Sequence, residues 1–153
     1  MNDLIIRVAV AADLPILKEF EQGIIATERP LNDCLKSEYI HYYDIGALID
    51  SDSSCVMVAE DDGVIVGSGY VRIKESKVYL QHKLHAYLGF MYVVPSHRGQ
   101  GINQLVIQTL IKWGKIQGMQ NFYLEAYAGN TSALKAYEKL GFKASLIEMK
   151  LSQ

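Results

Sequence analysis

The stretch VVPSHRGQGINQLV, residues 93–106, joins the end of a predicted strand to the start of a predicted helix. A β-branched pair precedes Pro95, and from Gly101 onward apolar residues recur at intervals of three and four. The first turn of a helix leaves backbone N–H groups without partners and carries partial positive charge, so it can hold an anion. Gly99 and Gly101 lack a Cβ and let amides approach a phosphate, and Arg98 adds a fixed charge. The stretch predicts a phosphate-binding turn; the competing interpretation is a tight turn that binds nothing.

Two familiar phosphate loops do not match this turn. A P-loop ends in Gly-Lys-Ser or Gly-Lys-Thr, and the dinucleotide fingerprint requires a third glycine after the pair. Here Gly101 is followed by Ile-Asn-Gln. A phosphate-binding role would therefore belong to another class of loop.

The composition limits the classes of protein to which the chain can belong. Its 153 residues are half apolar, which suits one domain over residues 1–153 with one core. Fifteen Lys and Arg against 17 Asp and Glu give a net charge of −2, so no overall field recruits nucleic acid or an anionic membrane. Without a secretion signal or a long apolar run, a cytoplasmic protein with free thiols at Cys34 and Cys55 is expected. The four histidines have no metal-ligand spacing, so no metal site is expected.

Outward from the quoted stretch, strand and helix patterns alternate along the chain. Strands are expected over 4–10, over 55–73 as a hairpin that turns at 61–63, and over 86–94, 121–128 and 143–151. Helices are expected over 13–25 and 31–42, from 101 to between 114 and 118, and from 130 to a closing glycine at 141. This alternation predicts an α/β domain with a mixed sheet.

Two motifs together resemble a known family. VVPSHRGQGIN resembles the acyl-CoA pyrophosphate loop of the GNAT superfamily of N-acetyltransferases, whose signature is Arg/Gln-x-x-Gly-x-Gly/Ala after a strand that ends in proline. Downstream, NFYLEAYAGNTSALKAYEKLGFK, residues 121–143, resembles the family's later strand, its Asn and its helix with a central Tyr. Asn103 departs from the small residue that ends the signature. The resemblance implies the acyl-CoA N-acyltransferase fold, a mixed, mostly antiparallel sheet with about four helices. It also implies acetyl transfer from acetyl-CoA to a primary amine within a ternary complex.

The resemblance further implies which residues contact acetyl-CoA. The strand GFMYVV, residues 89–94, is expected to offer backbone groups near Met91 and Val93 to the pantetheine arm and the acetyl carbonyl. Asn130 is expected to cap the helix that it precedes and to contact the cofactor. The pyrophosphate is expected to lie on the loop formed by Arg98, Gly99, Gln100, Gly101, Ile102 and Asn103.

Tyr137 stands where the family has its general-acid tyrosine. A phenol of pKa about 10 does not transfer its proton downhill to a thiolate of pKa about 8.5, so a hydrogen bond to the leaving sulfur supplies most of the benefit. Taken alone, Tyr137 shares a helical stripe with Ala133, Leu134 and Leu140, which favours a core position. The motif around it favours a catalytic one.

The general base is left open by the sequence. A lysine amine of pKa about 10.4 is neutral in only about one molecule in 2,500 at pH 7, so a lysine-type acceptor needs a base. Many family members carry a carboxylate in the strand before the loop, but alignment on Pro95 puts Gly89 and Phe90 there. The pattern does not choose among the substitutes Glu28, Glu125, His82 and His85.

The acceptor is expected to be an amine of a small molecule or a peptide, bound between the first two helices, the hairpin and the central strand. Tyr39, Tyr42, Tyr43 and the ERPL corner at 28–31 are expected to line its site, with core packing as the competing role of the tyrosines. The pattern indicates no strongly acidic pocket. Two other functions stay open: a non-catalytic acyl-CoA-binding sensor or regulatory subunit, and a scaffold whose glycine turn is structural. An exposed sheet edge would also allow a homodimer, although no motif indicates one.

Overall fold

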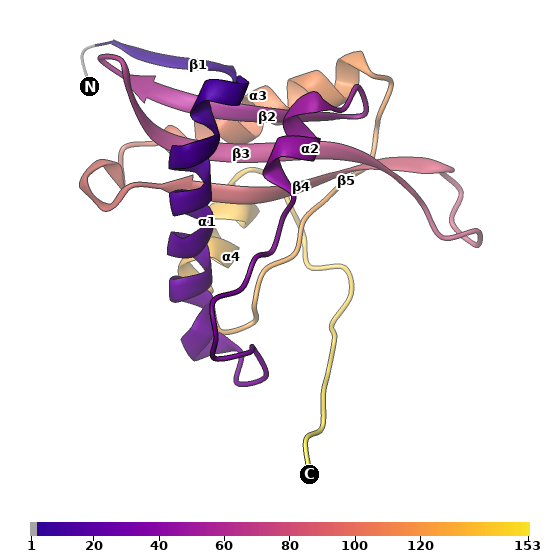
Figure 1. Ribbon diagram of the computed structural model, residues 1–153. Coiled ribbons are helices and arrows are strands. Elements are labelled where there is room, and N and C mark those ends of the chain that lie inside the picture. Colours follow the sequence, from indigo (N-terminus) through magenta and orange to yellow (C-terminus); the bar gives the residue numbers. More distant parts are fainter. Residues whose placement is uncertain (1–2) are drawn as a thin grey trace.

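The computed structural model describes residues 3–153 and shows a five-stranded sheet with helices around it (Figure 1). The strands are β1 (Leu4–Val8), β2 (Ser54–Asp61), β3 (Val64–Glu75), β4 (Leu84–Val93) and β5 (Phe122–Tyr123). The helices are α1 (Leu14–Glu28), α2 (Ile45–Asp50), α3 (Ile102–Ile116) and α4 (Thr131–Lys139). Short 3₁₀ turns lie at Ala11–Asp13, Arg29–Leu31 and Pro95–His97.

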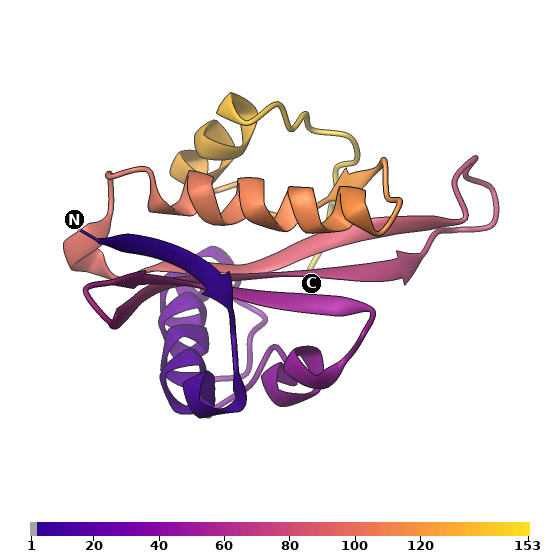
Figure 2. The ribbon, with the colours of Figure 1, turned by 90° about the horizontal axis from the view of Figure 1, so that it is seen from above.

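The strands lie in chain order across the sheet, from β1 to β5. Each neighbouring pair from β1 to β4 is antiparallel, and β5 runs parallel to β4 after the crossover through α3. Figure 2 shows α1 and α2 on one face of the sheet and α3 and α4 on the other. The mixed, mostly antiparallel sheet, with four α-helices in the described part of the chain, confirms the predicted fold class.

Alternating side chains along the strands build a core on each face of the sheet. On β2, Val56 and Val58 belong to the cluster that contains Leu17 of α1. Met57, between them, belongs to the other cluster, which contains Val106 of α3. The first six residues of β2 are buried because helices cover both faces, which explains the continuous apolar run in its sequence.

Glycines shape the hairpin and the seat of α3. Asp62 and Gly63 form the predicted turn between β2 and β3, with φ of 51° and 82°, as a two-residue hairpin turn requires. On β3, a Cβ at Gly69 would lie 2.9 Å from Leu110 Cδ1 and from Val106 Cγ1. The missing side chain lets α3 lie close to the sheet, which positions the glycine loop that precedes this helix.

The helix predicted over 31–42 is wrong. Residues 32–44 follow an irregular path, and the second helix begins at Ile45, capped by the Asp44 carboxylate. The Arg29 guanidinium donates to the carbonyls of Lys36 and Glu38 in this segment. Bonds between side chains and backbone compete with helix formation, and apolar spacing does not reveal them.

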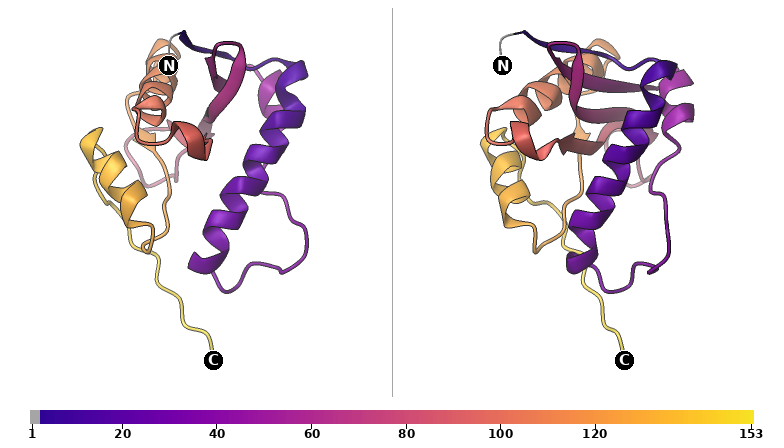
Figure 3. Two further views of the ribbon diagram at one scale, coloured as in Figure 1. Left: turned by 90° about the vertical axis from the view of Figure 1, so that its left-hand side faces the viewer. Right: turned by 60° about the vertical axis from the view of Figure 1, so that its left-hand side comes forward.

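The strand predicted over 143–151 is also wrong. Residues 143–153 form no strand and lead away from the sheet, past the end of α1 (Figure 1 and Figure 3). The strand predicted over 121–128 is reduced to β5, which has two residues. A strand exists only where another strand pairs with it, and alternation of side chains does not tell whether a partner lies within reach.

Candidate functional site

The candidate site lies where β4 and β5 separate. The two strands pair only through Ala86 with Phe122 and Tyr87 with Tyr123. Beyond these residues the chain leaves β5 and runs to α4 (Figure 1). Within residues 3–153, the edge of β4 beyond Tyr87 therefore has no strand partner on this side. Backbone groups on such an edge can bind an extended ligand as they would bind a strand.

A bulge turns the backbone of β4 at the same place. Ser68 pairs with Tyr92 and Tyr70 pairs with Gly89. The interval is therefore two residues long on β3 and three residues long on β4, which places a bulge in β4. Phe90 has a left-handed backbone with φ of 62°, and its carbonyl accepts a hydrogen bond from Ser68 Oγ at 3.0 Å. Met91, whose backbone is predicted to face the cofactor, lies in this bulge.

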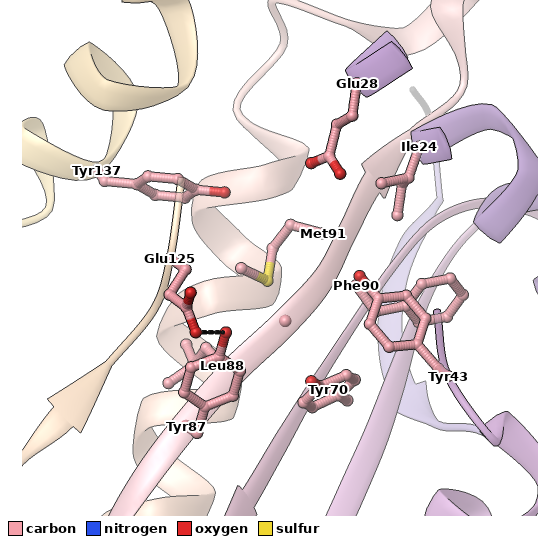
Figure 4. A pocket seen from close by; sticks show the side chains of 11 residues that line it. Ile24, Glu28, Tyr43, Tyr70, Tyr87, Leu88, Phe90, Met91, Glu125 and Tyr137 are labelled. Atoms are coloured by element: carbon pink, nitrogen blue, oxygen red, sulfur yellow. Dashed lines mark hydrogen bonds between the residues drawn. The ribbon is translucent and has the colours of Figure 1, made fainter. Parts of the chain in front are cut away.

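A pocket opens beside the bulge (Figure 4). Its walls come from the end of α1, from β3 and β4, from the chain after β5, and from α4. Tyr137 and Glu28 extend toward it from opposite sides in Figure 4, with Met91 between them. Its polar lining consists of Glu28, Tyr43, Tyr70, Tyr87, Glu125 and Tyr137.

A tyrosine ring occupies the space beside the position where many family members carry a carboxylate. Tyr70 is opposite Gly89 in the sheet, and a Cβ on Gly89 would lie 2.7 Å from Tyr70 Cζ and from its hydroxyl oxygen. No side chain fits at residue 89 while the ring keeps its place. Sequence reasoning missed Tyr70, because its position opposite Gly89 depends on the register between β3 and β4.

Two of the four substitutes for that carboxylate reach the pocket. Glu28 ends α1, and Glu125 lies on the chain after β5. Burial raises the pKa of Glu28. Glu125 accepts a hydrogen bond from the Tyr87 hydroxyl at 2.9 Å (Figure 4). The pocket is thus more acidic than the sequence pattern indicated, because the two carboxylates are distant in the chain.

The other two substitutes, His82 and His85, are not among the residues that line the pocket. Ser76 Oγ lies 2.7 Å from His82 Nδ1 and 2.9 Å from His85 Nδ1, and His82 Nε2 lies 3.0 Å from the Tyr123 hydroxyl. Burial, together with the charges of Lys74 and His82, lowers the pKa of His85. Of the four substitutes, the two carboxylates are therefore the ones that the pocket brings together.

Tyr137 both packs against the core and lines the pocket. Its ring packs against the core on the α3 face, 6.2 Å from the ring of Phe142, and its hydroxyl extends toward the pocket (Figure 4). Burial, and to a smaller extent the charge of Glu28, raises the pKa of Tyr137. The phenol is therefore protonated at neutral pH and can donate a hydrogen bond.

The aromatic residues expected near the acceptor separate into two groups. Tyr43 lines the pocket and packs against the rings of Tyr70 and Phe90, at 5.5 and 5.4 Å. Tyr39 is 69% exposed and packs edge-on against His41 instead. Neither Tyr39 nor Tyr42 is among the residues that line the pocket, so of the three tyrosines the prediction is supported for Tyr43 alone.

A buried carboxylate holds the segment that carries Tyr43. Glu21 of α1 is fully buried and accepts hydrogen bonds from the backbone amides of Tyr42 and Tyr43, at 2.8 Å each. Its other oxygen lies 2.9 Å from His41 Nδ1. Sequence reasoning missed Glu21; the signal is a charged residue beside Phe20 on the apolar face of a helix, where charges are rarely buried without partners.

The predicted glycine loop precedes α3. Gly99 and Gly101 have φ of 76° and 82°, and a Cβ on either would meet nothing within 4 Å. The backbone conformation therefore requires glycine, and the space around the loop is open. The helix begins at Ile102, and the first amides of a helix have no partner within it. This arrangement fits the phosphate that the loop is predicted to hold.

Arg98 supplies the fixed charge of the loop. It is exposed, its Nε donates to the Val93 carbonyl at 2.9 Å, and its guanidinium lies 5.5 Å from the centroid of the Tyr92 ring. None of the ion pairs found among residues 3–153 includes Arg98. The loop is also anchored to β2, because His97 Nε2 lies 2.8 Å from Asp61 Oδ2.

The other residues that are predicted to contact acetyl-CoA differ in how exposed they are. Gln100 is exposed on the loop, whereas the side chain of Ile102 is buried in the core, so only its backbone is available to a ligand. The Asn103 side-chain oxygen is buried and, within the described chain, has no hydrogen-bond partner. Asn130 caps α4 as predicted, with its oxygen accepting from the Ala133 amide at 3.3 Å.

Among residues 3–153, two kinds of feature are not found. None of the helices there has the length and apolar character needed to cross a membrane. Nor do three His, Cys, Asp or Glu side chains gather as the ligands of a metal ion would.

Comparison with known sequences identifies the family. The model of the acetyltransferase (GNAT) family matches residues 20–142. The probable N-acetyltransferase family 8 member 5 of Mus musculus is 31% identical over 87 residues, which are 56% of this chain and 37% of that protein. The chain thus spans well under half the length of this relative.

Comparison with solved structures supports the fold. A mutant of the BH1408 protein from Bacillus halodurans superposes with a TM-score of 0.86 at 19% identity, covering 97% of this chain and 99% of that one. A predicted acetyltransferase from Clostridium acetobutylicum, solved with acetyl-CoA, superposes with a TM-score of 0.76 at 18% identity, covering 98% and 96%. Because the family model spans most of the sequence and the fold agrees with it, this chain belongs to the acetyltransferase (GNAT) family.

Proposed function

We propose that this protein transfers the acetyl group of acetyl-CoA to a primary amine of a small molecule or a peptide, by direct attack while both are bound. Residues 1–153 form one acetyltransferase domain in this proposal. The observation that carries it is the separation of β4 from β5, which leaves a slot with the glycine loop at the end of β4. Tyr137 and two carboxylates line the same opening.

The loop and the edge of β4 would hold the cofactor. The backbone amides of the first turn of α3, together with Arg98, suit the pyrophosphate, because both are positive and the space beside them is open. The backbone of Met91 and Val93 suits the pantetheine arm, and Asn130 contributes from the start of α4. Bound there, acetyl-CoA supplies an activated acetyl carbonyl.

Tyr137 would stabilise the leaving thiolate. Its raised pKa keeps the phenol protonated, so its part is to donate a hydrogen bond to sulfur as negative charge develops. The ring is held by the core, which fixes the direction of the hydroxyl without a conformational change.

Glu28 would accept the proton of the attacking amine. A carboxylate whose pKa is raised toward neutrality is the stronger base, and burial has this effect on Glu28. Glu125 already accepts from Tyr87 and is exposed, which suits it to attracting and orienting the amine.

The acceptor that fits best carries a second positive charge beside the reacting amine. Two carboxylates and several tyrosine rings line the opening, and both attract cations. A diamine or a lysine-containing peptide meets this requirement, whereas an acidic acceptor would be repelled.

The proposal is tested by thermal unfolding with and without acetyl-CoA, followed by an assay of amine acetylation. Acetyl-CoA should raise the Tm of the wild type, because a ligand that binds only the folded state stabilises it. Arg98→Glu should lose most of this shift, and the matched charge reversal Lys112→Glu, on an exposed site of α3, should keep it. No shift in the wild type would overturn the proposal. A shift without turnover of any diamine or peptide would favour the acyl-CoA sensor instead.

A further inference from the structure

We propose that the β3–β4 tip, residues 74–85 at the end of the hairpin that joins these two strands, docks the protein on an anionic lipid surface. The apolar turn at its centre would enter the outer part of the hydrocarbon, and the lysines beside it would lie among the charged head groups. None of these residues lines the pocket beside Met91, so the inference is independent of the proposed acetyl transfer.

The β3–β4 tip extends away from the body of the domain. The two strands stay paired as far as Glu75 and Leu84, and the turn follows. Figure 1 and Figure 2 show this end of the hairpin beyond the helices that cover the two faces of the sheet. The glycine loop follows the opposite end of β4, so a surface that contacts the tip leaves that loop open to its ligand.

The turn at the centre of the tip is apolar and exposed. The Leu80 amide donates to the Lys77 carbonyl at 2.9 Å, which places Val78 and Tyr79 in the middle of the turn. Gly, Pro, Asn, Asp and Ser usually occupy such positions. Here Val78 is fully exposed, and Tyr79 and Leu80 are 74% and 40% exposed. Apolar side chains gathered in water at one place mark a surface that binds a partner.

The charge around this turn is positive. The tip carries Lys74, Lys77 and Lys83 against Glu75, a net charge of +2 in a chain whose overall net charge is −2. None of the ion pairs found among residues 3–153 includes these lysines. Lys77 Nζ lies 5.9 Å from the centroid of the Tyr79 ring, so positive charge and apolar surface are adjacent. Salt screens charges beyond about 8 Å, and distant acidic residues therefore do not cancel this local charge.

Contacts within the hairpin hold the tip in its extended position. The Ser76 amide donates to the Lys83 carbonyl at 2.8 Å. Ser76 Oγ lies within hydrogen-bond distance of His82 and His85, and His82 in turn lies 3.0 Å from the Tyr123 hydroxyl of β5. A loop that is already ordered loses less conformational freedom when it binds.

A lipid surface suits both properties of the tip, because it supplies negative charge and hydrocarbon together. A second copy of the chain suits it less, since a two-fold contact between two tips would bring Lys77 and Lys83 near their own counterparts. Nucleic acid is bound by basic side chains and by aromatic rings that stack on bases. It would leave the aliphatic side chains of Val78 and Leu80 without a partner.

The first experiment is sedimentation of the full chain with lipid vesicles. The wild type should bind vesicles of equal parts phosphatidylglycerol and phosphatidylcholine, should not bind phosphatidylcholine alone, and should be released by salt. Lys77→Glu/Lys83→Glu should lower the partition coefficient by about tenfold or more, because each lysine near an anionic surface contributes to binding. Lys112→Glu/Lys139→Glu, at exposed sites of α3 and α4, changes the net charge equally and should bind like the wild type. No binding of the wild type, or an equal loss in both variants, would overturn the proposal.

The second experiment tests whether the apolar turn enters the lipid. Val78→Ser/Leu80→Ser keeps every charge and should also lower the partition coefficient, with an unchanged circular dichroism spectrum. In Tyr79→Trp, anionic vesicles should shift the added fluorescence to shorter wavelengths, and brominated lipid chains should quench it. The wild type, whose single tryptophan is Trp113, gives the background. Full binding of the serine variant, or no quenching in Tyr79→Trp, would overturn the insertion of the turn.

Competition separates a lipid surface from other anions. Neither duplex DNA nor soluble glycerol phosphate should displace the wild type from the vesicles, because neither supplies hydrocarbon. Duplex DNA that binds more tightly than the vesicles, and binds Val78→Ser/Leu80→Ser equally well, would assign the tip to nucleic acid and overturn the docking on lipid.

Discussion

Tyr70 and Gly89 face each other across β3 and β4, and the ring of one occupies the space that a side chain on the other would need. Together they exclude a carboxylate from the middle of β4. In the proposed mechanism the base therefore comes from an element that reaches the same opening from the side, as Glu28 of α1 does.

A methyl group at residue 89 should destabilise the protein. In Gly89→Ala the new Cβ meets the Tyr70 ring at 2.7 Å, and overpacking of this kind costs about 1–3 kcal/mol in the free energy of unfolding. Gly46→Ala is the control, because its Cβ would have ordinary contacts, the nearest at 3.8 Å. Urea denaturation measures both. In a double-mutant cycle, Tyr70→Leu should relieve part of the cost, and additive effects would show that the two residues do not interact.

Tyr137→Phe should lower kcat by about 10²-fold, because it removes a hydrogen-bond donor to the leaving sulfur and keeps the ring. The shift of Tm with acetyl-CoA should be unchanged. Tyr123→Phe is the matched control, since its hydroxyl bonds to His82 and it does not line the pocket. Full activity of Tyr137→Phe in a steady-state assay would remove Tyr137 from the mechanism.

Glu28→Gln should lower kcat/KM and abolish the acid limb of its pH profile. In the wild type this limb should have an apparent pKa above the ordinary value of about 4.3, because burial raises the pKa of Glu28. Glu125→Gln should instead raise KM for the amine. If Glu125→Gln removes the acid limb and Glu28→Gln leaves it in place, the two roles are reversed.

Glu28→Gln should also be more stable than the wild type at pH 7. Because the pKa of Glu28 is higher in the folded than in the unfolded state, its ionisation opposes folding as the pH rises through the folded value. The gain in Tm of Glu28→Gln should therefore shrink as the pH falls from the raised folded value toward the ordinary value of about 4.3, and it should vanish below that value. Thermal unfolding of both proteins between about pH 4 and 8 measures this gain in Tm. The range includes the ordinary glutamate pKa of about 4.3. An equal gain at every pH would contradict the linkage.

Glu21→Ala should weaken binding of the amine without weakening that of acetyl-CoA. It leaves the amides of Tyr42 and Tyr43 without their acceptor, at a cost of about 1–3 kcal/mol for each amide left buried, and it releases the segment that carries Tyr43. The expected result is a raised KM for the amine and an unchanged shift of Tm with acetyl-CoA. Glu21→Gln keeps an oxygen for both amides and should restore most of the wild-type KM. A purely structural role would lower stability in Glu21→Ala and leave the KM for the amine unchanged.

Structural features that depend on residues close together in the chain could be predicted from the sequence. The glycine turn at Gly99 and Gly101, the start of α3 and the Asn130 cap depend on residues within one or two turns of one another. The helix predicted over 31–42 failed because the Arg29 side chain and the distant Glu21 carboxylate bind that segment. Apolar spacing contains no information about either bond.

By itself, the sequence determined the class of the fold, the glycine loop ahead of α3 and the family. Only the tertiary structure decided that Glu28 and Glu125 share one pocket, that the Tyr70 ring excludes a side chain at residue 89, and that residues 143–153 pair with no strand of the described chain. The physical reason is that backbone conformation and periodicity are local properties of a chain. Burial, pKa shifts and strand pairing depend instead on residues that folding brings together from distant positions.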